Sequence, residues 1–343
     1  MTDNPPDQRF IYPFGDDNLN LNMDAYTIDC SQYTGKETLD KAIHAQWCDK
    51  GLVVLVKTGM QHLSELERWS GVIFNDFNAY KAGSAPRSKW SEAVYSIDDT
   101  PPHIDMGYHN EGCYLSVSPR CLVFGSMDCP KKGGWTLVSD NEVITDLLLE
   151  TTIGQKMKQH GVRYIRNMTD KYSDNPIVHK HWQDTFQTDS RDEVEGYIKD
   201  EGWDHQWMPD GTLRTNYWSD AFEYNEQLNK SVFFANLANH GIFFDQWHPF
   251  NTLADEERPH TMVLGDGSLF TREDIMTVYA INNKASLGLR WQDADVALID
   301  NERWSHARPA YEIQPGEERV MGVTTGMLKE RVGSRSYIRN KHL

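Results

Sequence analysis

Residues 121–138, CLVFGSMDCPKKGGWTLV, contain two apolar runs separated by a turn. The runs at 121–125 and 135–138 have the length and composition of strands, and residues 130–134 supply the Pro and Gly that a turn between them needs. Similar short runs occur at 52–56, 231–237, 295–300 and 319–325. Short strands toward both ends of a chain that also contains helices favour a mainly β fold, a sandwich or jelly roll with peripheral helices, over a βαβ array.

Helical spacing of apolar residues predicts helices at 38–47 and 63–74. Asp140 is a candidate N-cap for a third helix, and Thr271 with Asp274 resembles a capping box that opens a helix ending near residue 284. The stretch 167–229 is polar and rich in Trp, and we expect it to be irregular. We therefore expect one domain over residues 1–343, with a mobile beginning at about 1–20 and a lid-like insertion at about 163–230.

The charge of the chain excludes several classes of partner. Of 343 residues, 34 are Lys or Arg and 51 are Asp or Glu, a formal charge of −17. Nucleic-acid and anionic membrane surfaces are disfavoured because both require clustered basic side chains. The beginning resembles no signal peptide and the run at 52–56 is too short to span a bilayer, so we expect a cytoplasmic protein with a small-molecule substrate. Five cysteines without a CxxC pair indicate neither a disulfide framework nor a zinc ribbon.

The pair His109 and Glu111 is a candidate for metal binding. On a strand, residues two apart point to the same face, and a histidine from a distant strand would complete a two-His-one-carboxylate site of the kind that binds Fe(II). Alone, H-x-E is a weak signal, and His103 with Asp105 is a competing pair. The other parts that such chemistry needs come later in the chain: Thr136 after Gly133-Gly134, His306, Arg308 and Arg319.

Taken together and in this order, these segments resemble the TauD/TfdA-like family of Fe(II)/2-oxoglutarate oxygenases, within it the SyrP-like and clavaminate-synthase-like branch. The resemblance extends over about residues 51–326 and includes 80–87, 108–114, 133–136, 182–188, 265–268 and 300–308. It implies a double-stranded β-helix, a form of jelly roll, and an enzyme that uses Fe(II), 2-oxoglutarate and O2.

Site residues follow from the resemblance position by position. It implies that His109, Glu111 and His306 bind the iron. It also implies that Thr136 and Arg319 hold the distal carboxylate of 2-oxoglutarate, with Arg308 supporting the site. Halogenases of this fold lack the ligand carboxylate, so the presence of Glu111 favours hydroxylation, desaturation or oxidative cyclisation.

The substrate is less constrained by the sequence. Several relatives have a second arginine four residues after the oxoglutarate arginine, where this chain has Val323, so a sulfonate or aryloxyacetate substrate is disfavoured. We expect a small amino acid or an amino-acid-derived metabolite, in specialised biosynthesis. Asp105 and Arg87 are candidate substrate residues, with Asp105 either binding an amine or stabilising the loop that contains Pro101 and Pro102.

Alternatives to this function are a catalytically silent jelly-roll binding protein and a cupin-like metalloenzyme that does not use 2-oxoglutarate. The first would be favoured by loss of a metal ligand, and the second does not need Thr136 and Arg319 together. The histidines His179, His240 and His248 lack a carboxylate at ligand spacing, and we interpret them as structural or solvated. Trp182, Trp203, Trp207 and Trp218 are interpreted as packing residues under the insertion. The oligomeric state does not follow from the sequence.

Overall fold

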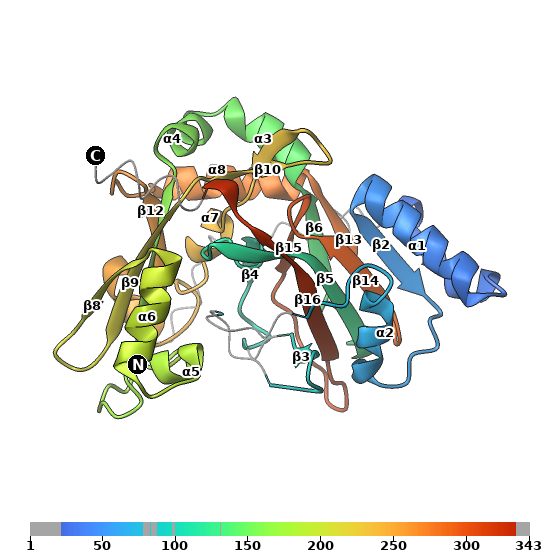
Figure 1. Ribbon diagram of the computed structural model, residues 1–343, viewed down its shortest axis with the longest axis horizontal. Helices are drawn as coiled ribbons and strands as arrows, with labels where there is room; N and C mark the ends of the chain where they lie inside the picture. Colours follow the sequence, from blue (N-terminus) through green and yellow to red (C-terminus); the bar gives the residue numbers. More distant parts are fainter. Residues whose placement is uncertain (1–21, 78–82, 84–87, 98–99, 131, 334–343) are drawn as a thin grey trace.

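Two β-sheets pack face to face in the computed structural model, which describes residues 22–77, 83, 88–97, 100–130 and 132–333 (Figure 1). The expected mobile beginning and Arg87 lie outside these residues. The larger sheet has six strands in the order β1 (Thr27–Asp29), β2 (Leu52–Val56), β14 (Val296–Asp300), β5 (Val117–Asp128), β16 (Val320–Glu330) and β3 (Tyr95–Ser96). Only β1 and β2 among these pair in parallel.

The smaller sheet is wholly antiparallel. Its order is β13 (Ser286–Leu289), β6 (Thr136–Asp140), β15 (Trp304–Arg308) and β4 (Met106–His109). Its residues Val138, Leu289 and Trp304 share one core cluster with Val54, Leu122 and Ile299 of the larger sheet. Two facing, mainly antiparallel sheets are the arrangement of a jelly roll, so the predicted fold class is confirmed.

The run at 52–56 is apolar throughout because both faces of β2 are buried. Val53 and Leu55 point to a second cluster, which also contains Ile43 and Trp47 of helix α1 (Lys36–Lys50). Leu52 and Val54 belong to the cluster between the two sheets. Alternate residues of a strand face opposite sides, so a strand covered on both sides has no polar positions. Helix α2 (Leu66–Ser70) packs beside α1 on the outer face, and it is shorter than the predicted 63–74.

The stretch 167–229 is more regular than the sequence predicts. With the residues around it, it forms a third sheet in the order β12 (His260–Leu264), β7 (Val162–Met168), β9 (Leu213–Ser219) and β8 (Asp204–Trp207), and a hairpin of β10 (Phe222–Asn225) and β11 (Lys230–Phe233). The prediction of irregular structure was therefore wrong. Buried polar residues such as Thr215 and Ser219 in β9 hid the strand pattern. The strand expected at 231–237 ends at Phe233.

Helices lie around the sheets. Helix α3 (Asn141–Leu149) begins at the predicted N-cap, where the Asp140 carboxylate accepts from the backbone N–H groups of Glu142 and Val143. Helix α8 (Arg272–Lys284) begins at the predicted capping box of Thr271 and Asp274. The remaining helices are α4 (Thr152–His160), α5 (Trp182–Phe186), α6 (Arg191–Glu201) and α7 (Leu237–His240).

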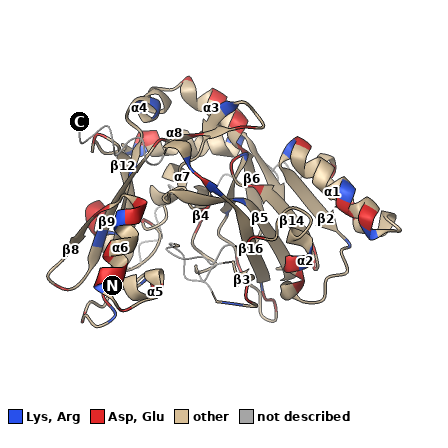
Figure 2. Cartoon of the chain, in the orientation of Figure 1, with Lys and Arg blue, Asp and Glu red and all other residues tan. Residues whose placement is uncertain are grey.

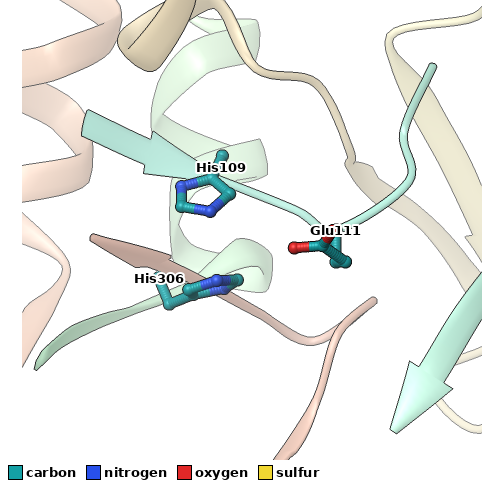
Figure 3. Close-up of side chains that lie close together, drawn as sticks. All are labelled: His109, Glu111 and His306. Atoms are coloured by element: carbon teal, nitrogen blue, oxygen red, sulfur yellow. The ribbon is translucent and has the colours of Figure 1, made fainter. Parts of the chain in front are cut away.

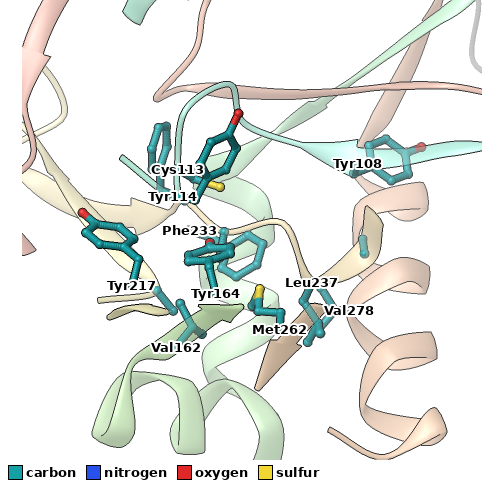
Figure 4. Packing of buried hydrophobic residues seen from close by; sticks show 14 of the residues in the cluster. Tyr108, Cys113, Tyr114, Val162, Tyr164, Tyr217, Phe233, Leu237, Met262 and Val278 are labelled. Atoms are coloured by element: carbon teal, nitrogen blue, oxygen red, sulfur yellow. The ribbon is translucent and has the colours of Figure 1, made fainter. Parts of the chain in front are cut away.

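The largest core cluster joins the third sheet to the helices. Val162 and Tyr164 of β7 and Met262 of β12 belong to it together with Leu237 of α7 and Val278 of α8 (Figure 4). This cluster packs the third sheet against α7, and α7 borders the cavity described below. Helix α7 also contacts β4.

Charged side chains are concentrated on the outer helices, with both signs on α1 and α6 (Figure 2). Within the part of the chain that the structure describes, no helix combines the length and apolar character needed to cross a bilayer. The five cysteines are all free thiols in this structure.

Candidate active site

Three side chains from two segments that are distant in the sequence converge between the two facing sheets. One ligand atom each from His109, Glu111 and His306 lies within 4.8 Å of the others (Figure 3). Among the described residues, no other group of three His, Cys, Asp or Glu side chains meets this condition. The competing pair does not converge in this way, because His103 is exposed and the Asp105 carboxylate accepts from the backbone N–H of Ala310 at 2.6 Å.

The two histidines are held together by strand pairing. His109 is the last residue of β4, His306 is in the middle of β15, and the two are direct partners in the antiparallel ladder. Their ring centroids are 4.1 Å apart. Glu111 is not on the strand, contrary to the sequence interpretation, because β4 ends at His109 and Glu111 lies in the turn that follows. Its carboxylate reaches the histidines from that turn, as Figure 3 shows.

The His109 ring is oriented by its own strand. Nδ1 lies 2.9 Å from the carbonyl oxygen of Gly107, and a carbonyl can only accept, so Nδ1 carries the proton. The lone pair of the neutral ring is then on Nε2, which is the arrangement that a metal-binding histidine needs.

Buried asparagines fix the segment that carries His109 and Glu111. The Asn301 side chain accepts from the Glu111 backbone N–H at 2.8 Å and donates to the Glu111 carbonyl at 2.9 Å. Asn236 Oδ1 accepts from the backbone N–H of Asn110 at 2.9 Å, and Asn239 Oδ1 accepts from that of Gly107 at 3.0 Å. These side chains satisfy backbone groups that would otherwise be buried without partners.

Gly107 permits the close approach of this segment to α7. A Cβ at position 107 would lie 2.5 Å from the carbonyl oxygen of Ala238, a distance that real side chains do not reach. Any larger residue would push β4 away from α7 and shift the histidine two residues later.

The predicted oxoglutarate residues line the same cavity as the three candidate ligands. The indole Nε1 of Trp291 donates to Thr136 Oγ1 at 2.9 Å. Because an indole N–H can only donate, the Thr136 hydroxyl accepts there and keeps its own hydrogen for another acceptor. Arg319 donates from Nε to the carbonyl of Gly134 at 3.1 Å, which fixes its guanidinium beside the turn that precedes β6.

Arg308 is largely engaged by the protein. Its guanidinium donates to the carbonyls of Thr100, Pro101 and Ile104, at 3.3, 3.1 and 2.6 Å. It therefore holds the loop before β4 against β15. The Asp105 carboxylate accepts a hydrogen bond from the backbone N–H of Ala310, which follows β15. Burial raises the pKa of this carboxyl to about 7, although the hydrogen bond from Ala310 and the charge of Arg308 oppose the shift. Asp105 is not among the residues that line the cavity.

Several other cavity residues were missed or misread at the sequence level. His179 and His240, interpreted as structural or solvated, line the cavity together with His260 and Phe243. Burial lowers the pKa of His179 and of His240 to about 3 and that of His260 well below its usual value, and Arg166 acts in the same direction on all three. No local pattern marks these residues, because they come from a loop, from α7 and from β12.

The donor set fits Fe(II). Two imidazoles and one carboxylate on one side, with open cavity on the other, is the facial arrangement of non-haem Fe(II) oxygenases. Thr136 and Arg319 add a hydroxyl and a guanidinium, the groups that bind a carboxylate of a chelating cosubstrate.

The comparison with models of protein families agrees with this donor set. The model of the family "Taurine catabolism dioxygenase TauD, TfdA family" matches residues 16–325. The chain is 25% identical over 278 residues to the dapdiamide synthesis protein DdaC of Enterobacter agglomerans, covering 77% of this chain and 79% of that protein. It is 23% identical over 280 residues to a clavaminate synthase-like protein of Arabidopsis thaliana, covering 75% and 83% of the two chains. A solved taurine dioxygenase from Burkholderia xenovorans aligns with a TM-score of 0.49 and 11% identity, covering 89% of this chain and 85% of that one.

Proposed function

Because the chain belongs to the taurine catabolism dioxygenase TauD, TfdA family, we propose that this Fe(II)- and 2-oxoglutarate-dependent dioxygenase oxidises a small amino acid or a metabolite derived from one. The substrate class is supported by the relatives, of which one is named for dapdiamide synthesis and the other is named clavaminate synthase-like. Both names refer to the making of a small molecule, so we also propose a role in specialised biosynthesis.

His109, Glu111 and His306 are the proposed iron ligands. The observation that carries this proposal is the convergence of their ligand atoms within 4.8 Å, inside a cavity that Thr136 and Arg319 also line. The Nδ1 contact of His109 with the Gly107 carbonyl supports it further, because it presents Nε2 as the donor atom. The protein's part is to hold these donors in place and to control access.

Thr136 and Arg319 are the proposed partners of the distal carboxylate of 2-oxoglutarate. When bound, the iron and its cosubstrate supply the oxidising chemistry, in which O2 is consumed and 2-oxoglutarate is converted to succinate and CO2 while the substrate is oxidised. The Thr136 hydroxyl, which accepts from Trp291, has its hydrogen available for a carboxylate oxygen. The Arg319 guanidinium, fixed through Gly134, adds a charge-assisted contact.

Arg308 is proposed as a positioning residue. Its hydrogen bonds to the carbonyls of residues 100–104 support this role, since they leave little of its guanidinium for a cosubstrate. The segment 163–230 is proposed to cover the substrate within one catalytic domain, which is supported by the position of His179 in the cavity wall.

The proposed reaction is hydroxylation, desaturation or oxidative cyclisation, because Glu111 occupies the position that halogenases of this fold leave open. The test is to supply the purified protein with Fe(II), 2-oxoglutarate and ascorbate and to screen amino acids and their derivatives for succinate release and a change in substrate mass. We expect succinate release that requires Fe(II) and rises with one class of substrate, and no halogenated product in the presence of chloride. A protein that binds neither Fe(II) nor 2-oxoglutarate contradicts the proposal.

A further inference from the structure

A second group of cavity residues lies outside the proposed iron and 2-oxoglutarate partners. We call it the amide–imidazole wall, and it consists of His179, Asn236, Asn239, His240 and His260. Asn239 and His240 belong to α7, Asn236 immediately precedes that helix, and His260 opens β12. Figure 1 shows α7 beside β4, the strand that carries His109.

The two amides of the wall have a fixed orientation. Oδ1 of Asn239 accepts from the backbone N–H of Gly107, and Oδ1 of Asn236 accepts from that of Asn110. Because a backbone N–H can only donate, these contacts identify the oxygens, and each Nδ2 is the atom left for a ligand. Neither Nδ2 has a hydrogen-bond partner within the part of the chain that the structure describes.

Two imidazoles of the wall, those of His240 and His260, are buried and each has a polar atom without a hydrogen-bond partner among the described residues. The His240 and His260 side chains are each 6% exposed, and their ring centroids are 4.5 Å apart. Nδ1 of each ring lacks a hydrogen-bond partner among the described residues. A buried polar atom without a partner is costly, so a ligand that supplies one gains affinity.

The charges around the cavity favour an oxygen acceptor over an ammonium group. Glu111 is the only carboxylate among the described residues that line it, and Glu111 is a proposed iron ligand. Arg308 and Arg319 also line the cavity, and the guanidinium of Arg166 acts electrostatically on the wall histidines. Asp105, the candidate amine partner, faces Ala310 and not the cavity.

We propose that the amide–imidazole wall binds an oxygen acceptor of the primary substrate, a carboxylate or a carboxamide, through the Nδ2 atoms of Asn236 and Asn239 and the ring of His240. This inference rests on the proposed function, since it assigns the substrate side of the same site. It replaces the expectation of an amine bound near Asp105. It assigns Asp105 the alternative role of stabilising the loop that contains Pro101 and Pro102, through its hydrogen bond with the backbone N–H of Ala310.

The first test uses three probes of equal chain length, pentanoate, pentanamide and pentylamine, on wild-type protein loaded anaerobically with Fe(II) and saturated with 2-oxoglutarate. Binding is measured by calorimetry at millimolar probe concentrations. We expect pentanoate or pentanamide to bind more tightly than pentylamine, and the tighter of the first two identifies the acceptor. Pentylamine binding equally or more tightly, or the absence of binding by all three probes, overturns the inference.

The second test changes the polarity of one wall amide without removing its contact with β4. In Asn239→Asp, a carboxylate oxygen can still accept from Gly107, but the donor becomes a negatively charged acceptor. We expect pentanoate affinity to fall by ~10-fold or more, as expected when a donor facing a charged group is replaced by a like charge. The charge-matched control is Asn251→Asp, at an exposed position, which should bind pentanoate like wild type.

Binding of Fe(II) and 2-oxoglutarate is measured on the same samples. If wild type binds neither, the proposed function fails. If it binds both but Asn239→Asp leaves pentanoate affinity unchanged, or the control lowers it equally, only the assignment of the wall fails.

Discussion

Replacing Asn301 with Ala should weaken iron binding although the residue supplies no ligand atom. Its side chain is fully buried and makes three hydrogen bonds, accepting from Glu111 N–H at 2.8 Å and donating to the carbonyls of Glu111 at 2.9 Å and Pro119 at 2.8 Å. Glu111 lies in a turn, beyond the end of β4, so strand pairing does not fix its backbone. Asn301 performs that function from the end of β14.

The expected loss in the free energy of unfolding follows from the backbone groups that Asn301→Ala leaves without a hydrogen-bond partner. One backbone N–H and two carbonyls lose their partner inside the protein, and a buried polar group without a partner costs about 1–3 kcal/mol. Water entering the space of the side chain would recover part of this, so we expect a loss of roughly 3–6 kcal/mol in the free energy of unfolding. Because the freed carboxylate then samples other positions, iron affinity should fall by ~10–100-fold.

The assay compares iron affinity with stability in two variants. Fe(II) affinity is measured by anaerobic titration, and the free energy of unfolding by urea denaturation without metal. The control is Asn167→Ala, because Asn167 also makes three side-chain hydrogen bonds, to the carbonyls of Glu256 and Arg258 and from Arg214, but on β7 and away from the ligands. We expect the control to lose stability while keeping wild-type iron affinity. A folded Asn301→Ala protein with wild-type affinity, or a control that loses affinity equally, would refute the positioning role.

Three further predictions follow from the site. His306→Ala should abolish Fe(II) binding in a metal titration while His103→Ala retains it, and the reverse result would mean that the wrong pair was assigned. Arg319→Ala should raise the 2-oxoglutarate concentration for half-maximal succinate release by roughly 30-fold or more while changing that for the primary substrate much less, with Lys rescuing it only in part; an unchanged cosubstrate titration would remove Arg319 from this role. The raised pKa of Asp105, about 7 in the folded protein against 3.8 unfolded, means that its contribution to stability is complete below about pH 4 and is lost as the pH rises through 7. Asp105→Asn should therefore gain on the order of 4 kcal/mol relative to wild type between pH 4 and pH 8 in urea unfolding, and parallel pH profiles would contradict the assignment.

Elements with a local signal could be predicted from the sequence. The capping box of Thr271 and Asp274 and the N-cap of Asp140 are contained within a few residues, and the structure has both. The core strand at 52–56 was recognisable because burial on both faces makes it continuously apolar. The strands β8 and β9 were missed, since β8 is largely exposed and β9 buries Thr215 and Ser219, so neither follows the apolar alternation of a half-buried strand.

Only those residues of the candidate site that belong to a sequence motif could be predicted. His109, Glu111 and His306 were identified by spacing and by family resemblance, and their convergence is a property of the three-dimensional structure. His260 and Asn239 carry no motif, and they meet at the cavity only because α7 packs against both β4 and β12. For Asp105 the sequence left two roles open, an amine contact and stabilisation of the loop before β4, and its hydrogen bond with the backbone N–H of Ala310 favours the second.

Since His109 and His306 are partners in one ladder, the candidate site cannot form before the chain has been synthesised through β15. A nascent chain on the ribosome exposes His109 and Glu111 early, but two ligands on an unpaired strand do not make a facial site, and β15 must first insert between β4 and β6. On the proposed ligand assignment, iron can therefore be bound only after β15 has paired with β4.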